Sequence, residues 1–244
     1  MKKRLGPGRR CFGFFHRSAP LEPLVFVWDI LDPNKLVLDE TVQTADTAVF
    51  YSINSQPGVS GVDLGNFLIK RVVGEVQSEM PNIKNFVTLS PLPKFSFWLN
   101  SFLSSKVDLE LEKSELDSIR SLGGNHLEWP IALKNVLTAR GWISDPQKRS
   151  ILKPILLKLA KIYLLDVKRP NSIYAYDPVA NFHLRNGASI YSLNWLGDTS
   201  YNGVRSSYGI MCNYNYILDQ IESNNEAYLK RGEIRFSRDV SSLY

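Results

Sequence analysis

One stretch of the chain constrains its fold more than any other, because a strand, a turn, a helix and a second strand are indicated in succession over residues 48–91. An apolar, β-prone run (AVFYSI) leads into a glycine-bearing turn, and a second strand-like run within NFVTLSPLP stops at Pro91. Between them, apolar residues recur at helical spacing over 65–79, and Pro81 follows. This order predicts a β–turn–α–β unit, whose parallel strands are joined by a right-handed crossover.

The flanking segments extend this unit into an α/β (α+β) fold. CFGFF (11–15) and the apolar run at 24–31 predict short buried strands, and SIYSLNWL and YGIMCNYNYIL predict strands near the end of the chain. Residues 95–103 predict a short helix, and three apolar-periodic segments make 108–168 a helical insertion or subdomain. The tail beyond residue 221 is polar.

Composition limits the classes of protein to consider. Hydrophobic residues make up 44% of the 244 residues and charged residues 22%, which suits an ordinary soluble core. No apolar run approaches the roughly 20 residues that cross a bilayer. The net charge of +5 is spread along the chain, and no zinc-finger spacing, RRM signature or basic heptad helix accompanies it. We therefore expect neither a membrane nor a nucleic-acid partner.

The cysteines and the ends of the chain bear on its compartment. Cys11 and Cys212 lie far apart without metal-ligand spacing, which fits a reducing compartment and predicts no metal site. The basic start is not followed by a secretory signal pattern, and the final SLY is not an SKL-type address. We expect a soluble intracellular protein, with cytoplasm, mitochondrion and peroxisome all open.

The glycine-bearing turn is a candidate anion site. Glycines at a strand-to-helix turn allow several backbone N–H groups to point at one anion, and the helix dipole adds partial positive charge there. A pyrophosphate suits such a site, although glycines also serve ordinary tight turns. The spacing is neither that of a P-loop nor a full dinucleotide fingerprint. The candidate residues are Ser60, Gly61, Val62, Asp63, Leu64, Gly65 and Asn66.

Long motifs make the chain resemble a known family. FYSINSQPGVSGVDLGNFLIKRVV, TLSPLPKFSFWL and DPVANFHLRNGASIYSLNWLGDTSYNGVRSSYGIMCNYNY together resemble the catalytic domain of the malonyl-CoA decarboxylases, in the same order. The resemblance implies a GNAT-like acyl-CoA-binding fold with a mixed central sheet. It also implies conversion of malonyl-CoA to acetyl-CoA and CO2, in the regulation of fatty acid metabolism. No metal or organic cofactor is implied, because coenzyme A is part of the substrate.

The resemblance also implies site residues. The family's catalytic serine lies in L-S-P-[IL]-P, which places it at Ser90, and its catalytic histidine lies in F-H-L-x-N-G, which places it at His183. In this family the serine is assigned as proton acceptor and the histidine as proton donor, and the resemblance implies that both also contact malonyl-CoA. Taken without the resemblance, the residues favour a strand-closing turn for Ser90 before Pro91 and a satisfied core histidine for His183.

Further candidates come from the same motifs. Tyr216 is a candidate contact of the thioester or carboxylate, and amide donors are available at Asn186, Asn194 and Asn213. The turn departs from the acetyltransferase pattern, since Ser60 replaces an arginine and Asp63 replaces the middle glycine. We expect the Asp63 carboxylate to point away from a pyrophosphate.

The resemblance begins where the family's catalytic domain begins, so residues 1–244 are expected to be that domain without the family's N-terminal helical oligomerisation domain. A homo-oligomer remains an option that the missing domain would weaken. Two alternatives to decarboxylation also stay open. One is a GNAT-type acyltransferase acting on an amine, and the other is a non-catalytic acyl-CoA-binding module.

Overall fold

The computed structural model describes most of the chain. The described residues are 12–15, 46–51, 64–105, 109, 111–139, 141–237 and 240, with side chains left out at 12–15, 51 and 64–70. The strand expected at 24–31 and the turn residues Ser60–Asp63 lie outside them.

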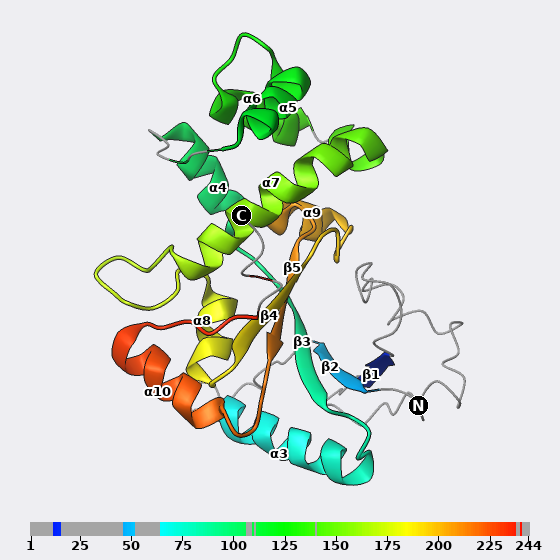
Figure 1. The fold of residues 1–244 in the computed structure, drawn as a ribbon, viewed down its shortest axis with the longest axis vertical. Helices are drawn as coiled ribbons and strands as arrows, with labels where there is room; N and C mark the ends of the chain where they lie inside the picture. The colour runs from blue at the N-terminus through cyan, green and yellow to red at the C-terminus, as the bar shows by residue number, and fades with distance from the viewer. Residues whose placement is uncertain are drawn as a thin grey trace.

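A five-stranded mixed sheet forms the centre of the fold, in the order β1-β2-β3-β5-β4 (Figure 1). Its only parallel pair among the described strands is β2 with β3, and the other neighbours are antiparallel. This agrees with the mixed sheet that the family resemblance implies. The strands are β1 (Phe12–Phe15), β2 (Thr47–Tyr51), β3 (Asn85–Pro91), β4 (Ser189–Asn194) and β5 (Met211–Asn215).

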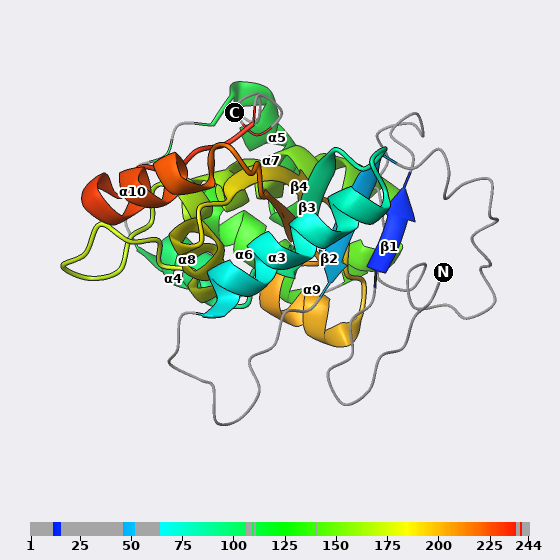
Figure 2. The ribbon, with the colours of Figure 1, turned by 90° about the horizontal axis from the view of Figure 1, so that it is seen from below.

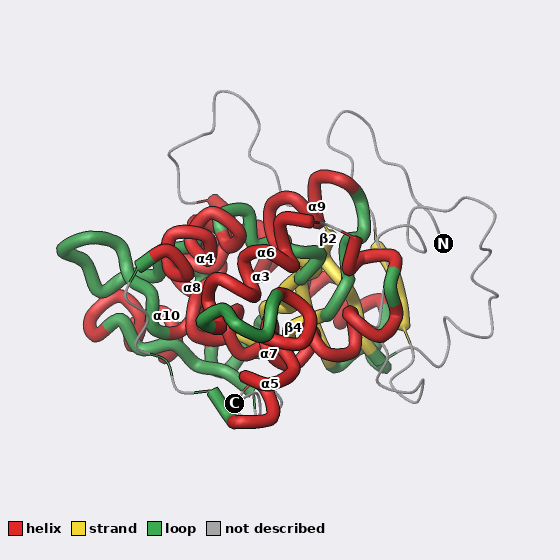
Figure 3. Tube along the Cα trace, turned by 90° about the horizontal axis from the view of Figure 1, so that it is seen from above, coloured by secondary structure: helices red, strands yellow, loops and turns green. Residues whose placement is uncertain are grey.

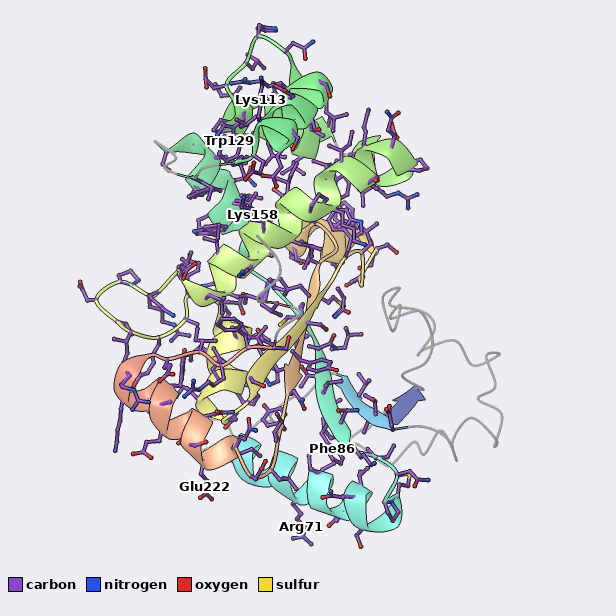
Figure 4. All side chains as sticks on the ribbon, viewed as in Figure 1. Arg71, Phe86, Lys113, Trp129, Lys158 and Glu222 are labelled. Carbon is purple, nitrogen blue, oxygen red and sulfur yellow. The ribbon has the colours of Figure 1, made fainter. Side chains whose placement is uncertain are left out.

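The two parallel strands and the helix of the predicted β–turn–α–β unit are confirmed, and the turn itself lies outside the described residues. Helix α3 (Leu64–Glu79) connects β2 to the parallel strand β3 and lies across both strands (Figure 2). Its apolar face buries Val73 and Val76 in the same core as Phe86 of β3. Arg71 lies on the outer side of the helix, whereas Phe86 lies on the sheet (Figure 4).

The helical insertion is also confirmed, and it lies at the opposite end of the molecule from α3 (Figure 1). The insertion comprises α5 (Lys113–Gly123), α6 (Trp129–Ala139), a 3-10 turn (Gly141–Ser144) and α7 (Pro146–Leu165), and the short helix expected at 95–103 is α4 (Phe95–Ser104). Helix α7 crosses between this end and the sheet, and its Lys158 pairs with Glu115 of α5 at 3.4 Å in a mostly buried ion pair.

Three helices were not expected from the sequence: α8 (Pro178–Arg185), α9 (Tyr201–Ser207) and α10 (Ile221–Arg231). The first two are short, and the third lies in the polar tail, where few apolar residues mark a buried face. Helices α8 and α10 pack side by side (Figure 3). Within the described ranges, no helix combines the length and the apolar character needed to cross a membrane.

Candidate active site

Ser90 lies near the end of β3, beside strand β5. The described pairing of β2 with β3 runs as far as Tyr51 opposite Leu89, and Ser90 is paired with Cys212 of β5. Side chains alternate between the two faces of a strand, which places Ser90 on the same face as Thr88. Both side chains are buried, with 6% of Ser90 and 1% of Thr88 exposed.

His183 reaches this face from helix α8. Asp177 caps the helix N-terminus, because its Oδ1 accepts the main-chain N–H groups of Val179 and Ala180, each at 2.9 Å. The hydroxyl of Tyr163 donates to the other carboxylate oxygen at 2.8 Å. Burial raises the pKa of Asp177, and these three hydrogen bonds oppose the rise. The fixed helix start places His183 six residues later, facing the sheet.

The two motifs meet in one buried hydrogen-bonded chain. Ser90 Oγ lies 3.1 Å from His183 Nε2, and His183 Nδ1 lies 2.7 Å from the Tyr216 hydroxyl. Ser90 Oγ also donates to Thr88 Oγ1 at 2.9 Å. The Tyr214 ring stacks on the imidazole, with centroids 4.4 Å apart and planes 21° apart. Side chains from β3 and from the β5 region therefore converge on His183 of α8.

The environment keeps these groups uncharged. Burial lowers the pKa of His183 to about 3, because an imidazolium would have to leave water without a counter-ion, so the ring is neutral at neutral pH. Burial likewise raises the pKa of the Tyr216 hydroxyl, which stays protonated. The site is a buried cluster of neutral proton donors and acceptors, where the low local dielectric strengthens hydrogen bonds and the interactions of any charge that forms.

The sequence-predicted residues fall into two groups. The structure brings Ser90, His183 and Tyr216 together. The hydroxyl of Tyr216, which the sequence suggested as a substrate contact, bonds to the histidine ring. Of the turn, Leu64–Asn66 form the first residues of α3, so the helix begins where the glycine motif predicts.

The amide candidates have other partners. Asn213 joins two strands, accepting from Ser192 and Asn194 and donating to the Thr88 carbonyl. Asn186 ends α8 by donating to the Phe182 carbonyl, and its own Oδ1 is buried with no hydrogen-bond partner in the described part of the chain.

Two residues at the site were missed by sequence reasoning. Thr88 contacts Ser90, and Tyr214 stacks on His183. A signal for each existed in the alternation of strand side chains, which puts Thr88 on the face of Ser90 and Tyr214 on the face of Tyr216. The alternation alone does not show that these residues share one face of the sheet, because that depends on the pairing of β3 with β5.

Comparison with known proteins places this arrangement in context. All of residues 1–244 match a family model described as the malonyl-CoA decarboxylase C-terminal domain. The chain is 39% identical over 264 residues to the mitochondrial malonyl-CoA decarboxylase of Anser anser anser and 38% identical over 262 residues to that of Mus musculus. Both matches cover 100% of this chain, but 51% and 52% of the relatives. The chain thus spans about half the length of these relatives.

Solved structures show the same likeness. The fold matches the crystal structure of malonyl-CoA decarboxylase from Rhodopseudomonas palustris with a TM-score of 0.77 at 39% identity, covering 95% of this chain and 48% of that one. It also matches the crystal structure of malonyl-CoA decarboxylase from Agrobacterium vitis with a TM-score of 0.76 at 34% identity, covering 98% of this chain and 58% of that one.

Proposed function

This chain belongs to the malonyl-CoA decarboxylase family, in the part described as its C-terminal domain, and we propose that residues 1–244 form a catalytic domain that converts malonyl-CoA to acetyl-CoA and CO2. One observation carries the proposal. Ser90 Oγ lies 3.1 Å from His183 Nε2, although 93 residues separate them in the chain. The serine motif and the histidine motif, which lie far apart in the sequence, thus supply one pair of residues that can transfer a proton.

The neutral, buried pair suits the chemistry. When the bond between the carboxylate and the α-carbon breaks, CO2 leaves and its electron pair passes into the thioester as an enolate. Preoriented donors in a dry site stabilise the negative charge that grows on the thioester oxygen. The α-carbon then takes up one proton, which completes acetyl-CoA. A neutral imidazole or hydroxyl is a weak acid, but an enolate carbon is a strong base, so His183 and Ser90 can deliver that proton while uncharged. The substrate's thioester is the electron sink, so the proposed reaction calls on no other cofactor.

The coenzyme A portion is proposed to bind at the turn before α3. Helix α3 has 16 residues, and its N-terminal end presents main-chain N–H groups and the positive end of the helix dipole. The contacts of Ser60–Asn66 with a pyrophosphate, and the outward direction of Asp63, stay predictions. A direct contact of Tyr216 with malonyl-CoA also stays a prediction. In this proposal Tyr216 contributes through its hydrogen bond to His183.

The test is turnover by the purified chain. Malonyl-CoA is added, and acetyl-CoA and CO2 are measured; Ser90→Ala and His183→Ala are each expected to lower kcat at least about 100-fold, the size of general acid–base effects. Ser121→Ala and His126→Ala remove the same groups from exposed positions in the helical insertion and should leave kcat unchanged.

Other outcomes would redirect the assignment. Full activity in either site variant would refute the proposed pair. Tight binding of malonyl-CoA by the folded chain without turnover would favour an acyl-CoA-binding module instead. Consumption of acetyl-CoA that depends on an added amine would favour an acyltransferase.

A further inference from the structure

Thr88 is held by the main chain of the neighbouring strand. The register of β3 and β5 pairs Val87 with Asn215 and Ser90 with Cys212. Between these pairs, the Tyr214 main-chain N–H donates to Thr88 Oγ1 at 3.1 Å, and the Asn213 side-chain amide donates to the Thr88 carbonyl. A β-branched side chain has few rotamers, and this one is also tied to a backbone donor. The oxygen of Thr88 is therefore a fixed point beneath Ser90.

This fixed oxygen is an acceptor for the Ser90 proton. A serine hydroxyl carries one hydrogen, and here it is donated to Thr88 Oγ1 at 2.9 Å. The contact between Ser90 Oγ and His183 Nε2, at 3.1 Å, then needs its hydrogen from the ring. With the hydroxyl turned away from it, Ser90 offers His183 only lone pairs.

The rest of the chain follows from the single proton of a neutral imidazole. If Nε2 carries it, Nδ1 is an acceptor, and the Tyr216 hydroxyl donates to it at 2.7 Å. All contacts are then consistent, running from Tyr216 to His183, to Ser90 and to Thr88. The reverse direction, in which the Thr88 hydroxyl donates to Ser90 and Ser90 donates to Nε2, fits the same distances and places the ring proton on Nδ1 with Tyr216 as acceptor. If the Thr88 oxygen is removed, Ser90 is expected to donate to Nε2, which selects this second arrangement.

We propose that Thr88 is a positioning residue that fixes His183 as the tautomer protonated on Nε2, and so makes Ser90 the acceptor and His183 the donor within the pair. The meaning of this assignment for catalysis rests on the proposed decarboxylation, but the tautomer itself does not. The described side-chain hydrogen bonds of Thr88 go to Ser90 and to the Tyr214 main chain, and in this proposal Thr88 does not touch the substrate. It acts by choosing the direction of the hydrogen bond between two residues that do.

The first experiment reads the tautomer directly. The chain is labelled with 15N-histidine, and the His183 signals are assigned by their loss in His183→Gln, which separates them from His16 and His126. The resting chain is expected to show a protonated Nε2 and an unprotonated Nδ1. Thr88→Val keeps the shape of the side chain but removes the hydroxyl, and it should move the His183 signals toward the Nδ1-protonated form. Thr88→Ser keeps the hydroxyl and should retain the original pattern.

A control separates this effect from general damage to the sheet. Thr47 lies in β2, where its hydroxyl donates to Asp46 at 2.7 Å. Thr47→Val removes a threonine hydroxyl from the same sheet and should leave the His183 spectrum unchanged. Circular dichroism melts of each variant report whether it is folded.

Kinetics supply the second readout. Thr88→Val should lower kcat roughly 10- to 100-fold with KM changed less than about twofold, because proton delivery is impaired and substrate binding is not. Thr88→Ser should restore kcat to within about threefold of the original chain.

The results that overturn the inference are distinct from those that overturn the function. A proton on Nδ1 in the unmodified chain refutes it even if Thr88→Val does not fold, and so does a His183 spectrum that Thr88→Val leaves unchanged. If the unmodified chain shows the Nε2 tautomer, and Thr88 variants shift it, but malonyl-CoA is not turned over, the inference stands and only the decarboxylase proposal fails.

Discussion

Replacement of Asp177 by alanine tests how helix α8, and His183 with it, is held in place. The carboxylate is fully buried and does two things: Oδ1 caps the first turn of α8, and Oδ2 accepts the Tyr163 hydroxyl. Loss of an N-cap costs about 1 kcal/mol. A buried hydroxyl left without its acceptor adds about 1–3 kcal/mol. We therefore expect Asp177→Ala to lower the free energy of unfolding by about 2–4 kcal/mol.

The chain contains a matched control. Asp145 precedes a proline and caps α7 by accepting the N–H groups of Gln147 and Lys148 at 3.0 and 3.1 Å, just as Asp177 precedes Pro178 and caps α8. Its side chain is 38% exposed, and water can replace the lost bonds. Asp145→Ala should therefore cost about 1 kcal/mol. The difference between the two variants isolates the buried contact with Tyr163.

Urea or thermal denaturation followed by circular dichroism measures both values. In a chain of this size each kcal/mol shifts Tm by about 2–4 °C, so a loss of 3 kcal/mol corresponds to roughly 6–12 °C. Asp177→Asn keeps an oxygen for the cap and should lie between alanine and the original residue. The reasoning is refuted if Asp177→Ala costs no more than Asp145→Ala, since the contact with Tyr163 would then contribute nothing.

Two further predictions concern the pH dependence of stability and one turn. Because burial lowers the folded-state pKa of His183 from 6.5 to about 3, the native state binds fewer protons, so its stability falls as the pH drops below 6.5. Between pH 6.5 and 5 this one group should remove about 2 kcal/mol, and His183→Gln should show a flatter dependence in denaturation curves; an unchanged slope would contradict it. Gly187 has φ of +79°, and a Cβ there would lie 2.1 Å from the Ile221 carbonyl oxygen, so Gly187→Ala should destabilise by at least about 1–3 kcal/mol. Gly74→Ala, in open space on α3, should instead stabilise by about 0.5–1 kcal/mol in the same thermal assay, and equal effects would show that neither the turn nor the clash matters.

The sequence predicted the parts of the fold that have strong periodicity. Helix α3 and its flanking strands stand out because Val73 and Val76 recur at helical spacing between two apolar runs. Helix α8 was missed because eight residues give little periodicity, yet its start was readable: Asp177 before Pro178 is a cap followed by proline in the first turn.

Part of the candidate site could likewise be predicted from the sequence, and part could not. The resemblance singled out Ser90 and His183, because residues alone favoured a turn and a core histidine. Nothing local could place an imidazole from α8 against the end of β3, since that contact depends on the packing of distant elements. Thr88 and Tyr214 lay within reach of a strand-alternation argument, but only the pairing of β3 with β5 says that their faces coincide.

The alternation Asn213-Tyr214-Asn215-Tyr216 ties the formation of the site to the correct register of β5. If β5 slipped by a single residue against β3, each aromatic ring near the imidazole would be exchanged for a carboxamide, and the rings would turn to the other face of the sheet. A mispaired chain would thus lose core volume and chemistry in the same step, so selection for a well-packed interior also selects for a working site.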